Sequence, residues 1–162
     1  MKSILRFALM IGLLAGLSVP ATAHADTWVI DGAHTHVGFK IRHMMVSWVR
    51  GSFGAVEGTL EMSPGKLETL AATVTIDATS IDTANQKRDD HLRSADFFDV
   101  ATFPQLTFVS KKVVAKKGSK AFELVGDLTI HGVTKEVTLQ AEGFTEPMKD
   151  PWGNTKIGTS AT

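Results

Sequence analysis

The sequence lacks cysteine altogether among its 162 residues. Disulfide bonds, thiolate metal ligands and cysteine nucleophiles are therefore excluded, and stability must come from burial and hydrogen bonding. Common catalytic motifs are missing too, since the chain has no nucleophile elbow, no glycine-rich phosphate loop and no metalloprotease helix. These absences favour a protein that binds something over an enzyme.

Long apolar runs are also scarce, and none reaches the roughly 20 apolar residues that a membrane-spanning helix needs. An apolar stretch from Phe7 to Val19 follows two basic residues, Lys2 and Arg6, and precedes small residues that end at Ala25. This three-part pattern is typical of a secretory signal peptide. We therefore expect residues 1–25 to be removed by cleavage after Ala25 and the mature protein to be exported.

The mature chain, residues 26–162, has no strong charge of either sign. It keeps 15 of the 17 basic residues and all 17 acidic ones, which gives a formal charge of −2. No basic footprint for nucleic acid remains, and the overall balance indicates neither a polyanion nor an anionic membrane as partner. The length suits one domain with a substantial core.

Alternation of apolar and polar residues with a period of two dominates the mature chain and predicts strands with one dry and one wet face. Turn residues at Pro64-Gly65 and His131-Gly132 join two neighbouring pairs of these strands into β-hairpins. The alternating segments cover residues 35–43, 56–62, 70–77, 106–108, 123–130 and 137–143.

One segment, Asn85 to Phe98, departs from this pattern. It is rich in charge and places Leu92, Ala95 and Phe98 at helical spacing, which predicts a short helix. Antiparallel hairpins with one helical interruption predict an all-β fold, either a sandwich or a closed barrel.

The sequence leaves the interior of this fold open to two interpretations. Small residues recur on the expected inner face, where they either leave volume for a ligand or mark bulges and tight bends. Residues 154–162 look like the beginning of a strand with no return strand after it, so either the sheet is open or closing strands are missing. The small inner residues are Gly58, Ala72, Gly126, Ala141 and Gly143.

The segment Arg88 to Asp99, followed by Phe103-Pro104 and Leu106-Thr107-Phe108, closely resembles the signature of the YceI-like family. Further matches occur in the same order along the mature chain. They are His34, Val37, Phe39 and His43, then Gly51 to Phe53, Ser80 to Thr83, Gly126 to Thr134, and Gly153-Asn154.

The resemblance implies a periplasmic protein with an antiparallel, lipocalin-like β-barrel and one short helix. It also implies that the apolar tunnel of the barrel holds a polyisoprenoid such as a quinone tail, or a fatty-acid-like amphiphile. Members of the family continue past a segment like Lys156 to Thr162, so we expect this chain to lack its C-terminal closing strands. Family analogy also suggests transient contact with a membrane or with a membrane quinone-using cytochrome, and a homodimer.

A long hydrocarbon needs only an apolar tube, because each buried methylene contributes about 0.8 kcal/mol. The alternative is that the inner side chains simply pack against one another, so that a filled barrel acts through its surface as a structural or stress-related interaction protein. The expected lining residues are Val37, Phe39, Ile41, His43, Val56, Leu60, Val74, Ile76, Leu106, Phe108, Leu124 and Leu128.

The histidines do not favour a metal site. His34 and His36 share a predicted wet face, and no local carboxylate completes a ligand triad. His43 lies on the opposite face, where we expect it to be buried against a ligand head group or a backbone carbonyl.

A charged cluster in the predicted helix mixes carboxylates, a histidine and cations, which resembles catalytic composition. Pairing within the helix and with nearby strand ends explains it more simply. We expect Arg88, Asp89, His91 and Leu92 to fix the helix over the barrel as a cap or gate, and we expect neither a catalytic residue nor a cofactor.

Overall fold

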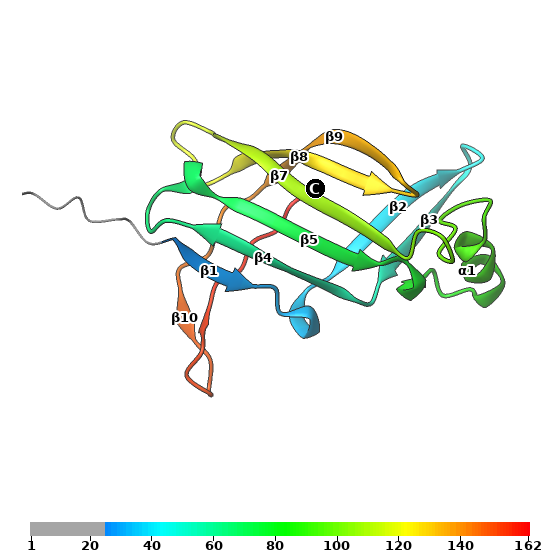
Figure 1. Cartoon of the computed structure of the whole chain (residues 1–162), viewed down its shortest axis with the longest axis horizontal. Coiled ribbons are helices and arrows are strands. Elements are labelled where there is room, and N and C mark those ends of the chain that lie inside the picture. The colour runs from blue at the N-terminus through cyan, green and yellow to red at the C-terminus, as the bar shows by residue number, and fades with distance from the viewer. Residues whose placement is uncertain (1–24) are drawn as a thin grey trace, which may run out of the picture.

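The computed structural model describes residues 25–162, so the signal peptide expected over residues 1–25 lies outside the described part of the chain except for its last residue. Nearly half of the described residues form antiparallel strands, and the chain has one short α-helix in this range (Figure 1). The predicted all-β fold class is confirmed.

The larger of the sheets has six strands in the order β1-β4-β5-β7-β8-β9, and every neighbouring pair is antiparallel. Both predicted hairpins are present, as β4–β5 and β8–β9. The second closes through a two-residue turn in which His131 and Gly132 have φ of 50° and 70°, as a type I′ turn requires. The strands are β1 (Asp26–Val29), β4 (Val56–Met62), β5 (Ala71–Asp77), β7 (Gln105–Ala115), β8 (Phe122–Ile130) and β9 (Val133–Ala141).

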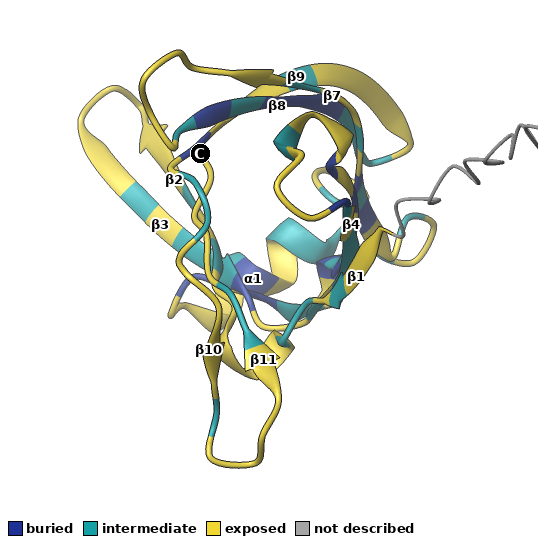
Figure 2. Cartoon of the chain, turned by 90° about the vertical axis from the view of Figure 1, so that its left-hand side faces the viewer, coloured by how far each residue is buried: buried dark blue, intermediate teal, exposed yellow. Residues whose placement is uncertain are grey.

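A bulge interrupts the pairing of β7 with β8 between Ser110 and Lys112. The extra residue shifts the inward positions of β7 from Leu106 and Phe108 to Val113, so the simple alternation fails over the second half of this strand. A bulge also increases local twist and bending. It therefore contributes to the curvature of the sheet that Figure 2 shows from one end.

A three-stranded sheet lies opposite the large one and contains β2 (Val37–His43), β3 (Ser47–Phe53) and β6 (Ile81–Asp82). In Figure 2, β2 and β3 face the concave side of the six-stranded sheet. Two further strands, β10 (Met148–Lys149) and β11 (Thr155–Lys156), form a small hairpin of their own. Short 3₁₀ helices occupy Gly32–His34, Leu67–Thr69 and Ala78–Ser80.

The strands of residues 25–162 do not close into a barrel, because β1 and β9 remain at the two edges of the six-stranded sheet. The strand expected from residue 154 onwards is also only partly formed. Thr155–Lys156 pairs with β10 instead of the large sheet, and Ala161 makes one isolated bridge to Ala141 at the end of β9.

Helix α1 covers Gln86–Arg93 and is shorter than the segment predicted to be helical. It begins as expected, because the Asn85 side chain caps it by accepting a hydrogen bond from the Arg88 N–H at 3.0 Å. It ends at Arg93, where the Ser94 hydroxyl and N–H both bond to the His91 carbonyl. Ala95 therefore lies outside the helix and is exposed, so the helical spacing that included it was wrong.

Candidate functional site

Two apolar clusters lie on the concave side of the large sheet, and the second also includes residues of the opposite, three-stranded sheet. The first, called the Phe108 cluster, has the buried residues Leu70, Ala72, Phe108, Phe122, Leu124 and Ala141. The second, called the Phe53 cluster, lies toward α1 and has the buried residues Phe53, Ile76, Ala78, Ile81 and Leu106. Val74 packs against both clusters, so the two form one continuous apolar face.

Part of this face is only half-buried by the chain's own side chains. Leu60, Val74 and Leu128 lie at inward positions of three different strands and pack on the Phe108 cluster, yet each keeps intermediate exposure. Val137 and Leu139 on the edge strand β9 do the same. The face is therefore a curved apolar surface in which the cluster residues are buried and the side chains packed on them stay partly exposed to solvent.

Ten of the twelve residues predicted to line an apolar tube belong to these clusters or pack against them. The structure thus brings residues of β4, β5, β7 and β8 on the concave side of the large sheet together with residues of β2 from the opposite, three-stranded sheet, although contact with a ligand stays a prediction. The ten are Val37, Phe39, Val56, Leu60, Val74, Ile76, Leu106, Phe108, Leu124 and Leu128.

The burial expected for Ile41 and His43 was wrong. Ile41 is 58% exposed and His43 is exposed too. Both lie in the outer half of the β2–β3 hairpin, where β3 pairs only with β2, because its pairing with β6 is confined to Ser52 and Phe53. Figure 2 shows this half of the hairpin as exposed.

The sequence reasoning missed several buried residues of the face. Phe122 is 2% exposed and immediately precedes the alternating segment 123–130. The same alternation, extended by one residue, would have placed it on the inner side with Leu124. Ala78 and Ile81 are fully buried, but they lie in a one-turn 3₁₀ helix and a two-residue strand, which are too short to show a period. Phe53 was recognised only as the last residue of the Gly51 to Phe53 match to the family signature, and its burial was not predicted.

The small inner residues are explained by close packing at three positions. A Cβ on Gly126 would lie 2.6 Å from the Phe108 ring, and one on Gly58 would lie 2.2 Å from the Thr73 carbonyl oxygen. Gly143 has φ of 100°, in a backbone region that residues other than glycine rarely adopt. These glycines permit close approach of the chain to itself, and they do not mark empty volume.

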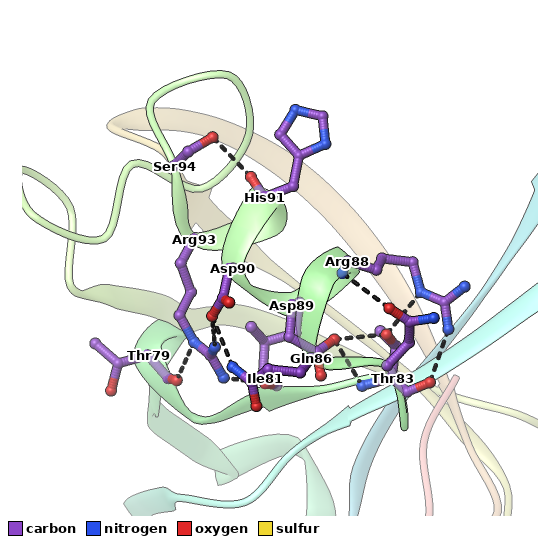
Figure 3. A network of polar contacts seen from close by, with 11 residues as sticks. Thr79, Ile81, Thr83, Gln86, Arg88, Asp89, Asp90, His91, Arg93 and Ser94 are labelled. Atoms are coloured by element: carbon purple, nitrogen blue, oxygen red, sulfur yellow. Dashed lines mark hydrogen bonds and ion pairs between the residues drawn. The ribbon is translucent and has the colours of Figure 1, made fainter.

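The helix is fixed to the neighbouring strand by a buried network around Thr83 (Figure 3). The Asp89 carboxylate, only 4% exposed as a residue, accepts hydrogen bonds from both the N–H and the hydroxyl of Thr83. Arg88 donates to the Thr83 hydroxyl at 2.7 Å and to its carbonyl at 2.8 Å. Each charged group thus has partners, as burial requires.

A second arginine strengthens the attachment. Arg93 donates to the carbonyls of Thr79 at 2.9 Å and Ile81 at 2.7 Å, and it pairs with Asp90 at 3.2 Å. His91 points away from this network in Figure 3 and lies 3.3 Å from Asp96 at the surface. Leu92 packs on the Phe53 cluster, so the helix covers one end of the apolar face.

No group of three or more histidine, aspartate or glutamate side chains within residues 25–162 is placed to hold a metal ion. His34 instead lies 3.0 Å from Asp31, which also accepts a hydrogen bond from Lys156 at 2.8 Å. The hydrogen bonds from Lys156 and His34 lower the pKa of Asp31 to about 2. This cluster joins the start of the fold to β11.

A hollow of about 540 Å³ on the described surface lies largely outside the apolar face. Its lining includes Glu57, Thr75 and Asp77, which lie on the wet side of β4 and β5, opposite to Ile76. A long apolar chain has little to gain there. In the same described range, no helix is long and apolar enough to cross a membrane.

Comparison with known proteins places these features in a family. A family model described as the YceI-like domain matches residues 28–161. A UPF0312 protein of Vibrio cholerae is 38% identical over 154 residues, which cover 94% of this chain and 80% of that protein. Protein YceI of Escherichia coli O157:H7 is 41% identical over 147 residues, which cover 91% of this chain and 74% of that protein.

Solved structures give the same result. The Campylobacter jejuni YceI protein matches with a TM-score of 0.63 and 39% identity, over 82% of this chain and 76% of that one. The BcnA protein of Burkholderia cenocepacia matches with a TM-score of 0.67 and 28% identity, over 74% of each chain.

Proposed function

The chain belongs to the YceI-like family, and on that premise we propose that it is a periplasmic, non-enzymatic protein that holds a long-chain lipid for transport or storage. The proposed ligand is a polyisoprenoid or a similar amphiphile, such as a quinone tail. One observation carries the proposal: the Phe108 and Phe53 clusters form a continuous apolar face that the chain's own side chains cover only in part.

The dimensions of this face suit an extended hydrocarbon. From Leu106 to Val113, β7 crosses from one cluster to the other, a distance of roughly 23 Å at ~3.3 Å per residue. Each methylene that moves from water onto this face contributes about 0.8 kcal/mol. Affinity would therefore come from the length of the chain, and no catalytic or metal group is required.

The periplasmic location rests on the signal-peptide pattern of residues 1–25. The non-enzymatic part of the proposal is supported by the charged network on α1. Asp89 and Arg88 are both committed to hydrogen bonds with Thr83, so this network fixes the helix in place.

The experiment is organic extraction and mass spectrometry of the mature protein, purified without detergent, beside a Val74→Arg variant. Val74 touches both clusters, so an arginine there interrupts the face at its centre. Val109→Arg is the matched control, because Val109 on β7 pairs with Thr73, the residue before Val74, so it faces the other side of the sheet, and it is 48% exposed. We expect a stoichiometric prenyl lipid in the wild type and the control, and none in Val74→Arg.

A folded wild-type protein that yields no lipid would count against the proposal. Circular dichroism and thermal melting establish whether Val74→Arg is folded. If it is not, Leu60→Trp provides a second test, because it fills the open side of the face without adding charge. Retention of the full lipid load by whichever of the two variants is folded would show that the ligand binds elsewhere.

A second candidate is a structural or stress-related interaction protein whose interior is filled. It is favoured by the packing at Gly126, where the Phe108 ring occupies the space that a small residue would otherwise leave. This candidate predicts no extractable lipid from the wild type. It also predicts that Leu60→Trp destabilises the protein, since a filled interior has no room for the larger side chain.

A further inference from the structure

The turn of the β2–β3 hairpin presents three consecutive apolar side chains to solvent. Met44, Met45 and Val46 are 80%, 78% and 84% exposed. They join neither apolar cluster of the concave face. Contiguous exposed apolar residues that have polar residues around them mark sites of interaction with a partner or a membrane.

The backbone conformation of this turn does not explain why methionine occupies positions 44 and 45. Met44 and Met45 have φ of 47° and 62°, in the left-handed region that asparagine and glycine adopt more readily than methionine. The turn is nevertheless well defined, because the Val46 N–H donates to the His43 carbonyl at 3.0 Å. Two exposed methionines in unfavourable conformations point to a role outside folding.

Cations gather on one face of the same hairpin. Lys40, Arg42 and Arg50 lie on the side that faces away from the concave interior, together with Trp48, and residues 37–53 contain no carboxylate. The Lys40 ammonium lies 4.2 Å from the centroid of the Trp48 ring and the Arg42 guanidinium lies 5.0 Å from it. Arg42 also donates to the Met45 carbonyl at 3.0 Å, which joins the basic face to the tip.

This arrangement is typical of a segment that enters a membrane surface. Apolar side chains insert at the boundary of head groups and acyl chains, an aromatic ring lies at head-group level, and cations are attracted to anionic lipids. The overall charge of −2 conceals this local concentration, because the acidic residues lie elsewhere in the chain.

We propose that the tip of the β2–β3 hairpin docks onto the surface of an anionic phospholipid membrane. Met44, Met45 and Val46 insert, Trp48 lies at the interface, and Lys40 and Arg50 face the lipid phosphates. This goes beyond the holding of a lipid, since it identifies where the protein meets a membrane. It holds whether or not the concave face carries a ligand.

The absence of cysteine makes a site-specific test straightforward. Val46→Cys, labelled with a polarity-sensitive fluorophore, is mixed with phosphatidylcholine vesicles that do or do not contain phosphatidylglycerol. Trp152→Cys is the matched control, because Trp152 is also 84% exposed but lies in the distant β10–β11 turn. We expect the fluorophore emission to shift to the blue at position 46 and not at position 152. The shift should require phosphatidylglycerol in the vesicles and should become weaker at high salt.

Charge removal gives the second measurement, by co-sedimentation with the same vesicles. Each cation near an anionic surface strengthens binding about fivefold, so Lys40→Gln with Arg50→Gln is expected to weaken it roughly 25-fold. Lys112→Gln with Lys117→Gln removes two exposed cations elsewhere and is expected to leave binding unchanged.

Three results would overturn the proposal. They are no shift at position 46 with anionic vesicles, an equal shift at position 152, or a shift at position 46 that grows with protein concentration without vesicles. The last would indicate a second copy of the chain as the partner. Val74→Arg is expected to keep its vesicle binding, so failure of the lipid-holding function and failure of membrane docking are separable.

Discussion

Gly126 provides a test of how far the chain fills its own interior. A Cβ at this position would lie 2.5 Å from the Val109 carbonyl oxygen and 2.6 Å from the Phe108 ring. Either the backbone of β7 or the ring must move, and overpacking of this kind costs about 1–3 kcal/mol. For a chain of this size each kcal/mol lowers the Tm by roughly 3–4 °C, so Gly126→Ala is expected to lower it by roughly 3–12 °C.

The assay is urea denaturation followed by circular dichroism, together with thermal melting. Gly54→Ala is the control, because a Cβ there has its nearest neighbours 4.0 Å away in Ser80, and the change is expected to stay within about 0.5 kcal/mol. A Gly126→Ala variant as stable as the control would refute the reasoning, since it would show that the space beside Gly126 is empty.

A double variant separates the two contacts. Phe108→Leu removes the ring that a Cβ on Gly126 would meet, but it leaves the Val109 carbonyl in place. We expect Gly126→Ala with Phe108→Leu to be less destabilised than the sum of the single changes, by about 0.5–2 kcal/mol. Strict additivity would mean that the ring is not the obstacle.

Three further predictions concern the attachments of the fold. Asn85→Ala removes the cap of α1 and is expected to cost about 1 kcal/mol in urea denaturation, whereas Asn85→Asp keeps the cap and most of the stability. Arg93→Met removes the 2.7 Å hydrogen bond to the Ile81 carbonyl, so amide hydrogen exchange should accelerate in α1 and stay unchanged in the large sheet; uniform acceleration would contradict a local role. Hydrogen bonds with Lys156 and His34 lower the pKa of Asp31 to about 2. The ionised carboxylate therefore stabilises the fold above about pH 4, and this stabilisation is lost as the pH falls from about 4 to about 2. The difference in urea midpoint between wild type and Asp31→Asn should disappear over the same range, and a difference that persists at lower pH would refute the assignment.

The hairpins and the start of the helix were predictable because their signals are local. Alternation identified β4, β5, β8 and β9, and the His131-Gly132 turn fixed the register of the last pair. Asn85 is a strong N-cap residue and its position set the first residue of α1. Ten of the predicted lining residues point into the two apolar clusters for the same reason, since alternation determines which side chains share a side of a strand.

The rest depended on contacts that a period of two does not encode. Ile41 and His43 alternate in the same way as Val37 and Phe39, so the pattern predicts the same burial for all four. It does not show that the half of β2 that carries Ile41 and His43 lies beyond the short pairing of β3 with β6 and is exposed. The bulge at Lys111 inverts the alternation of β7 without a glycine or proline to signal it. The cationic face of the hairpin was hidden because net charge averages over the whole chain.

The position of a bound lipid on the concave face is tested most directly by photo-crosslinking. A prenyl chain that carries a photoactivatable diazirine is bound to the mature protein and irradiated, and the labelled residues are located by peptide mass spectrometry. Labels are expected on Leu60, Val74 and Leu128, which are half-buried on the concave face. Labelling that instead favours Val109 and Val114, which are 48% and 43% exposed on the opposite face, would contradict this position.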